Sequence, residues 1–268
     1  MTAPETLALV GAGKMGSSLL GGWLAAGFEP RRISVYDPAP SDALRAQAAK
    51  WGFALNPAHA PAEAVVLAVK PQALDAVAAG IAALFGRDSF LLSILAGKTV
   101  HNLAARLPAS AILRAMPNTP AAVGRGVTGV FANEATRPDQ REKAQFLLSG
   151  VGGVEWVERE SLIDAVTAIS GSGPAYVFHL VEALAEAGTQ LGLPADLSLR
   201  LARATVEGSG ELLRRQPDIS AATLRKNVTS PGGTTQAALD VLMAPDGLTP
   251  LMVRAGAAAR KRAEDLSG

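Results

Sequence analysis

The sequence predicts an α/β fold: a doubly wound sheet followed by an all-helical half. Short apolar runs of strand length alternate with Ala- and Leu-rich segments of helix length through the first half. A glycine-rich loop, Gly11–Gly16, follows the first of these runs. The strand-like runs stop at Ser161, so we expect one domain over residues 1–160 and a second over residues 161–268.

Composition narrows the classes of protein. Of the 268 residues, 49% are hydrophobic and 18% are charged, as in a globular domain. A net charge of +1 gives no broad attraction for nucleic acid or an anionic membrane, and neither is expected as a partner. The chain has no cysteine, which excludes disulfides and Cys-ligated zinc, and no metal is expected. Without a signal pattern or an apolar run of ~18 residues, a cytoplasmic location is expected.

The expected strands are continuous apolar runs, as parallel strands covered on both faces require. They span residues 7–10, 33–36, 64–69, 90–95 and 111–116. Helices are expected after the glycine loop and over residues 41–51, 71–85 and 99–107. Ligands of such sheets bind beyond the carboxyl ends of the strands, so the residues that follow each run are the candidates for chemistry.

The loop Gly11–Gly16 has the spacing of a dinucleotide site. Its first glycine permits a tight turn, the second lets amides approach a pyrophosphate, and the third lets the helix pack closely. The helix N-terminus then holds the anion. Asp37 ends the second strand about 20 residues later, where a carboxylate binds the ribose. A nicotinamide or flavin dinucleotide is predicted, and a purely structural turn is the alternative. The candidates are Val10, Gly11, Ala12, Gly13, Lys14, Met15, Gly16 and Asp37.

Three further strand ends should line the same crevice. They carry Lys70-Pro71, Ala96-Gly97 and Pro117–Pro120. An ammonium group directly after a buried strand is costly unless it meets an anion or a dipole. Lys70 therefore has two interpretations, a functional cation or a lysine whose stem lies along the surface while its charge reaches water.

The second half reads as a series of helices. Ser161 and Asp164 predict a capping box, and the stretch Ser170–Pro174 interrupts the helix that follows. Further helices are expected over residues 174–191, 194–215, 220–228, 234–243 and 248–266. Their apolar stripes need more core than a small bundle provides, so we expect this domain to pack against a second copy of itself.

The segment Ser230–Thr235 predicts a second anion site. Two adjacent glycines before a helix form a nest of backbone amides, and three hydroxyl groups add donors. Such a nest fits a carboxylate. Plain helix capping by Ser or Thr is the alternative for this segment taken alone.

Together these motifs resemble pyrroline-5-carboxylate reductase over the whole chain. The motifs that carry the resemblance are Gly11–Gly16, Ala68–Pro71, Met116–Pro120, Ser170–Tyr176 and Ser230–Thr235. The resemblance implies reduction of 1-pyrroline-5-carboxylate to L-proline, the last step of proline biosynthesis, with NADPH or NADH. It also implies a Rossmann-type domain, an all-α dimerisation domain, and a homodimer that often assembles further into a decamer.

The resemblance also assigns roles to residues. Ser230, Gly232, Gly233 and Thr234 are implied to bind the substrate carboxylate, and Thr235 the ring nitrogen. Thr235 is the best catalytic candidate, either donating a proton or only orienting the imine, and Lys70 is a second, electrostatic one. Tyr176 lies in an apolar helical stripe, which favours packing. The remaining residues implied to touch the cofactor are Asn56, Ala68, Val69, Lys70, Pro71, Ala96 and Gly97.

Asp37 bears on the choice of cofactor. Its carboxylate suits the ribose hydroxyls of NADH and would repel a 2′-phosphate. Three rival functions are the alternatives: a non-catalytic dinucleotide sensor, a β-hydroxyacid dehydrogenase-like oxidoreductase and a ketol-acid reductoisomerase. The sensor would lose the second anion site, the dehydrogenase needs a lysine that residues 161–191 lack, and the reductoisomerase needs clustered acids for magnesium.

Overall fold

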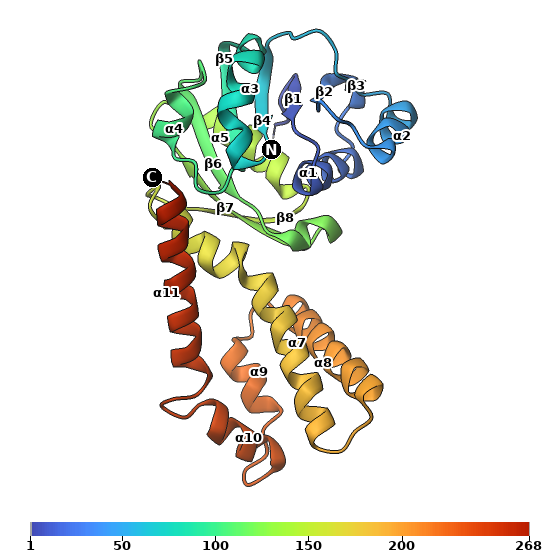
Figure 1. Cartoon of the computed structure of the whole chain (residues 1–268), viewed down its shortest axis with the longest axis vertical. Coiled ribbons are helices and arrows are strands. Elements are labelled where there is room, and N and C mark those ends of the chain that lie inside the picture. The colour runs from blue at the N-terminus through green and yellow to red at the C-terminus, as the bar shows by residue number, and fades with distance from the viewer. Residues whose placement is uncertain (1, 268) are drawn as a thin grey trace. The chain divides into compact units, whose positions relative to one another are not determined.

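A computed structural model describes residues 2–267, which divide into two compact units (Figure 1). Unit 1 comprises residues 2–172 with 259–267, and unit 2 comprises Gly173–Ala258. Unit 1 holds the sheet and unit 2 is helical, which confirms the expected fold class. The proposed domain boundary after residue 160 stays a prediction.

The sheet of unit 1 has eight strands in the order β3-β2-β1-β4-β5-β6-β7-β8. All neighbouring strands are parallel except β6 and β7, which are antiparallel. The strand order reverses between β1 and β4, so the crevice for a ligand is expected at their carboxyl ends. The strands are β1 (Leu7–Val10), β2 (Ile33–Tyr36), β3 (Ala54–Leu55), β4 (Ala62–Leu67), β5 (Phe85–Ser93), β6 (Ala111–Met116), β7 (Gly126–Ala132) and β8 (Gly152–Trp156).

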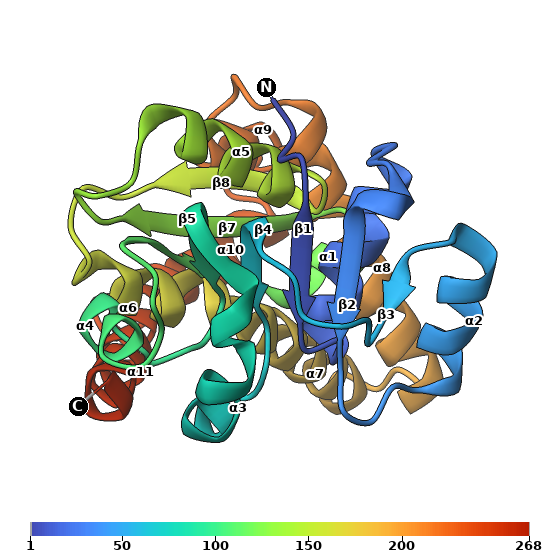
Figure 2. The same cartoon turned by 90° about the horizontal axis from the view of Figure 1, so that it is seen from above.

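Helices cover both faces of the sheet, as Figure 2 shows for α3 and α5. Alternate strand residues enter two separate cores: Leu9 and Val66 pack with α1, α2 and α5, whereas Val65 and Leu67 pack with α3 and α4. Both faces of the sheet are covered by packed helices, which explains the continuous apolar runs in the strands. The helices of this layer are α1 (Lys14–Ala25), α2 (Asp42–Trp51), α3 (Leu74–Ile81), α4 (Val100–Ala104) and α5 (Pro138–Ser149).

The five expected strands and the helices between them are confirmed, with small shifts of their ends. Residues 117–160, for which no element was predicted, form β7, α5 and β8. Each of these strands contains two glycines, and each carries a polar residue, Thr128 in β7 and Glu155 in β8, so they lack the continuous apolar run that marks the others. The two-residue strand β3 is too short to leave a pattern.

The start of the helical half differs in detail from the prediction. Helix α6 (Leu162–Val166) begins as expected, but the Ser161 side chain makes no capping hydrogen bond, so the capping box is wrong. Ser161 already has helical backbone angles, which an N-cap residue does not. A π-helical turn, Thr167–Gly171, then separates α6 from α7 and corresponds to the predicted interruption.

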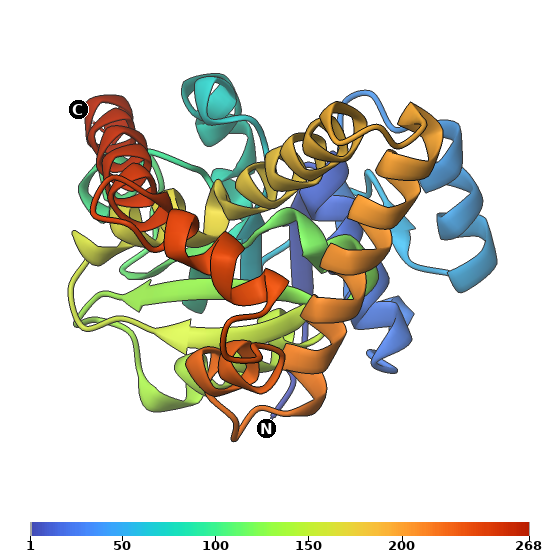
Figure 3. The same cartoon turned by 90° about the horizontal axis from the view of Figure 1, so that it is seen from below.

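Unit 2 contains α7 and α8, which pack against each other, together with α9 and α10 (Figure 3). Helix α11 begins in unit 2, and its last residues belong to unit 1. None of the described helices is long and apolar enough to cross a membrane. The bounds agree with the predicted helices: α7 (Gly173–Gln190), α8 (Ala195–Arg215), α9 (Ala221–Asn227), α10 (Thr234–Leu242) and α11 (Leu248–Ser267).

Candidate active site

The three glycines of the loop meet three different steric demands. Gly11 has a φ of +91°, and a Cβ there would lie 2.8 Å from the carbonyl oxygen of Ala68. A Cβ at Gly16 would lie 2.2 Å from the carbonyl oxygen of Gly11, so α1 can approach the loop only without a side chain. Gly13 is the N-cap of α1 and has open space beside it. This cradle fits a pyrophosphate, because the first-turn amides of a helix point outward unpaired.

Asp37 lies directly beside this loop. Its Oδ2 accepts a hydrogen bond of 2.9 Å from the amide of Ala12, and its Oδ1 accepts one of 2.9 Å from the amide of Ala39. The predicted neighbourhood of Asp37 and the glycine loop is therefore present. Each carboxylate oxygen keeps a further lone pair, which a ribose hydroxyl can use.

A pocket of about 350 Å³ opens next to Asp37. Its lining is mostly apolar with a few polar side chains, among them Asp37 and Asn56, as is typical of a small-molecule site. The rings of Tyr36 and His59 lie 4.9 Å apart at this pocket. The sequence did not point to His59, which stands in an irregular loop after Asn56-Pro57. The lining residues are Val10, Tyr36, Asp37, Pro38, Asn56, Pro57, His59, Val69, Ala76, Val77, Gly80 and Ile81.

The turns after β4 and β5 also lie in unit 1. The amide of Ala68 bonds the carbonyl of Val10 at 2.8 Å, which ties the end of β4 to the end of β1. Lys70 is exposed and has no ion-pair partner among the described residues, so the argument from costly burial does not apply to it. Gly97 has a φ of +69°, and a Cβ there would lie 2.9 Å from the carbonyl oxygen of Leu266 near the end of α11.

Two motifs that are far apart in sequence meet in unit 1. The side chain of Asn118 accepts a hydrogen bond from the Val127 amide at 2.9 Å and donates one to Ser170 Oγ at 3.3 Å. A Cβ at Gly171 would lie 2.7 Å from Cε of Met116. Met116 and Asn118 thus lie against Gly171 and Ser170, and the missing side chain at Gly171 permits the close approach.

The second nest lies in unit 2. Gly232 has a φ of +68°, and the Gly233 amide bonds the Ser230 carbonyl at 3.0 Å, which forms a tight turn before α10. Gly233 is the N-cap, and none of the side chains that the structure describes caps this helix. The alternative of plain capping by Ser230 or Thr234 is therefore wrong. Ser230 and Thr234 are exposed, and Thr235 is half-buried.

These features define the class of the protein. A dinucleotide loop, a ribose-end carboxylate and an adenosine-sized pocket on a doubly wound sheet are typical of a nicotinamide-dependent oxidoreductase. Among the described residues, no group of three His, Asp or Glu side chains gathers as a metal site would require.

Comparisons with known proteins give the family. A family model described as "Pyrroline-5-carboxylate reductase dimerisation" matches residues 160–266, and one described as "NADP oxidoreductase coenzyme F420-dependent" matches residues 6–97. The pyrroline-5-carboxylate reductase of Pseudomonas aeruginosa is 39% identical over 100% of this chain and 98% of its own length. The Synechocystis enzyme is 40% identical over 97% of both. The chain belongs to the pyrroline-5-carboxylate reductase family.

Solved structures agree with this assignment. The structure of a pyrroline-5-carboxylate reductase from Coxiella burnetii covers all of this chain and all of its own, with a TM-score of 0.91 and 36% identity. The Plasmodium falciparum enzyme, solved with NADP bound, covers 98% of both chains with a TM-score of 0.79 and 27% identity. The expected activity, NAD(P)H-dependent reduction of 1-pyrroline-5-carboxylate in proline biosynthesis, is confirmed and favoured over its alternatives.

Proposed function

We propose that two nests of main-chain donors share the work of the reductase. The loop Val10–Gly16, with Asp37, Asn56 and the turns Ala68–Pro71 and Ala96–Gly97, would hold the coenzyme. The segment Ser230–Thr235 would hold the imine. The observation that carries this proposal is the N-terminus of α10, which no side chain caps and whose amides are therefore available to an anion.

The carboxylate of 1-pyrroline-5-carboxylate suits this second nest. Amides at the start of a helix favour a negative charge through hydrogen bonds and the helix dipole. Gly232, at a positive φ, has open space beside it, so a ligand can approach its backbone. The exposed hydroxyls of Ser230 and Thr234 would add donors to the same carboxylate.

Thr235 is the residue that we propose to face the ring nitrogen. When bound, NAD(P)H supplies the hydride that reduces the C=N bond. The Thr235 hydroxyl would hydrogen-bond the nitrogen and align the imine, and the proton would come from solvent or arrive with a protonated substrate. Lys70, being exposed, would contribute an electrostatic effect near the nicotinamide.

We also propose that NADH is accepted well and that its kcat/KM exceeds that of NADPH. Asp37 carries a formal negative charge beside the expected ribose position, and its carboxylate is fixed by the amides of Ala12 and Ala39. A 2′-phosphate would be repelled there unless a cation came between.

Steady-state consumption of NADH and NADPH with racemic 1-pyrroline-5-carboxylate tests the assignment. Thr235→Ala should lower kcat at least about 10-fold, with the KM of the coenzyme changed less than about 2-fold, because the lost hydroxyl acts on the imine. Thr235→Ser should restore most of the turnover. Thr189→Ala is the control, since this exposed hydroxyl bonds only the Ala185 carbonyl of its own helix. Unchanged turnover in Thr235→Ala would remove the proposed role.

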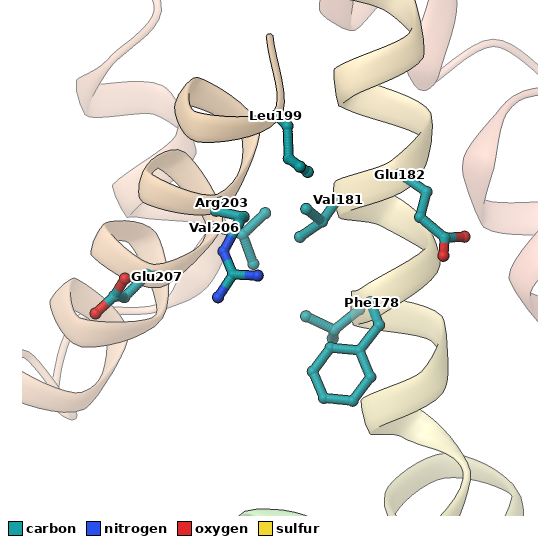
Figure 4. Close-up of a pocket in the computed structure, with 8 residues that line it drawn as sticks. Phe178, Val181, Glu182, Leu199, Arg203, Val206 and Glu207 are labelled. Carbon is teal, nitrogen blue, oxygen red and sulfur yellow. The ribbon is translucent and has the colours of Figure 1, made fainter. Parts of the chain in front are cut away.

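The helical half of the chain is also proposed to hold two copies of the protein together. The large apolar side chains left exposed on α7 and α8 support packing of residues 161–268 against a second copy, and a decamer of five dimers is the further expectation. Figure 4 shows part of this surface, a groove of about 480 Å³ in which Val181 from α7 faces Val206 from α8. The division into a dinucleotide-binding domain and a substrate-binding domain, and a cytoplasmic location, belong to the same proposal.

A further inference from the structure

Asn56 has an unusual backbone. Its φ is +49°, and it is the only residue other than glycine with a positive φ in the part of the chain that the structure describes. Asn is one of the few residues that tolerate this left-handed conformation. The Asn56 amide bonds the Val35 carbonyl at 2.8 Å, so the unusual geometry begins directly where β3 pairs with β2.

This conformation brings the Asn56 side chain back to Asp37. The Asp37 amide donates a hydrogen bond of 2.9 Å to Asn56 Oδ1, and Asn56 Nδ2 donates one of 2.8 Å to the Asp37 carbonyl oxygen. Beyond the end of β2, the Asn56 side chain thus acts as a strand would: it bonds both the amide and the carbonyl of Asp37. We refer to this reciprocal pair as the amide clamp.

The amide clamp acts on a carboxylate that is itself held on both oxygens. Asp37 Oδ2 accepts from the Ala12 amide in the glycine loop, and Oδ1 accepts from the Ala39 amide. With its main chain and its carboxylate both fixed, Asp37 has little freedom to turn away from an approaching phosphate. Asn56 and Asp37 line the same pocket of about 350 Å³.

We propose that Asn56 is a positioning residue that sets the choice of coenzyme through Asp37. The amide clamp holds the Asp37 carboxylate at the ribose end of the pocket, where it accepts the two hydroxyls of NADH and repels the 2′-phosphate of NADPH. This inference rests on the proposed coenzyme site. It differs from a direct coenzyme contact by Asn56, because the effect of Asn56 then depends on the carboxylate of Asp37.

A double-mutant cycle read by calorimetry tests the inference. The dissociation constants of NADH and NADPH are measured without imine for the wild type, Asn56→Gly, Asp37→Ser and the double variant. Asn56→Gly keeps the left-handed conformation free of strain and removes only the side-chain amide. It should lower the ratio of the NADPH to the NADH dissociation constant at least 5-fold. In the Asp37→Ser background, the same change should alter that ratio less than 2-fold.

Asn56→Ala separates the amide from the backbone. It also lacks the amide but strains the left-handed conformation, so it should match Asn56→Gly in coenzyme ratio while melting at a lower temperature.

Two results would overturn the inference: an unchanged ratio in Asn56→Gly, or a full effect of Asn56 that persists without the Asp37 carboxylate. The wild-type ratio is a separate readout. Suppose that the wild type binds NADPH more tightly, while the ratio of dissociation constants still responds to Asn56 only when Asp37 is present. That result would reject the proposed NADH acceptance and would support the role of the amide clamp. Because binding is measured without imine, the result is also independent of the roles proposed for Ser230–Thr235.

Discussion

Gly13 and Gly16 belong to one loop, yet they tolerate a side chain very differently. A methyl group at Gly16 would overlap the carbonyl of Gly11, which is main chain and cannot rotate away. At Gly13 the same methyl group meets nothing within 4 Å, and the backbone φ of −66° is ordinary. We infer that Gly16 serves packing and Gly13 serves access of the ligand.

Alanine at each position should separate these two roles. Gly16→Ala should lower the free energy of unfolding by about 2 kcal/mol or more, because a well-packed contact is overfilled. Gly13→Ala should cost less than about 1 kcal/mol, mainly from a poorer N-cap. It should nevertheless raise the dissociation constant of NADH about 10-fold, since the methyl group would occupy the approach to the amides.

Urea unfolding and calorimetric titration measure the two effects side by side. Gly21→Ala on α1 is the control, because a Cβ there has open space and the residue lies away from the loop. Equal stability of Gly13→Ala and Gly16→Ala, or tight NADH binding by Gly13→Ala, would contradict the division of roles.

Residue spacing is enough to predict some of the site. Gly16 and Asp37 are recognisable because a pyrophosphate and a ribose stand a fixed distance apart on a strand, turn, helix and strand. The pairing of Asn56 with Asp37 is not recognisable in this way, since it depends on a left-handed residue that many loops could place elsewhere. His59 likewise gains its position from the fold alone.

A buried charge joins several elements of unit 1. Arg114, on β6, is 4% exposed, and its Nη1 lies 2.7 Å from Oε1 of Glu160. The same oxygen accepts the Val100 amide at the start of α4, also at 2.7 Å. Glu160 therefore gives the buried Arg114 guanidinium the charged partner that it needs. The same carboxylate also accepts a hydrogen bond from an otherwise unpaired amide at the start of α4.

Near these residues lies Asp164, on α6, whose charged carboxylate is disfavoured by burial. Burial raises the pKa of Asp164 above its ordinary value, Arg114 opposes that rise, and Glu264 and Glu160 add to it. The folded state thus binds a proton more readily than the unfolded chain does. Stability should therefore fall as the pH rises from the ordinary value of 3.8 through the raised pKa.

Asp164→Asn should remove this pH-dependent loss. We expect a higher melting temperature than the wild type at pH 7, with the difference shrinking towards pH 3, where Asp164 is protonated. Melting curves between pH 3 and 8 measure it, with the exposed Asp218→Asn in unit 2 as control. A variant that is less stable than the wild type at pH 7 would show that the charge of Asp164 is needed.

Unit 2 leaves an apolar surface that one chain does not cover. Phe178 on α7 is 63% exposed, beside the groove between α7 and α8 (Figure 4). Contiguous apolar surface of this kind marks an interaction site in a globular protein. We expect it to be covered by the same surface of a second chain, since a twofold interface pairs a patch with itself.

Phe178→Gln should weaken that association. Light scattering after size exclusion should give the wild type a mass of at least twice the 27.4 kDa of one chain. The variant should shift towards the monomer on dilution, with the dissociation constant raised at least about 30-fold, as expected for an aromatic hot spot. Trp51→Gln in unit 1 is the matched control, because Trp51 is 42% exposed but lies outside the region that matches the dimerisation model. A monomeric wild type, or an unaffected Phe178 variant, would contradict the expectation.

Features that depend on residues close together in the chain can be predicted from the sequence. The buried strands, the glycine loop and the helices of unit 2 each leave a periodic or spaced pattern, because their burial repeats along a few residues. The contacts between distant segments were not readable: β7 and β8 at the edge of the sheet, the contact of Asn118 with Ser170, and the amide clamp on Asp37. These arise when folding places groups from separate segments within hydrogen-bond distance, and no local repeat in the chain records which partner each group will meet.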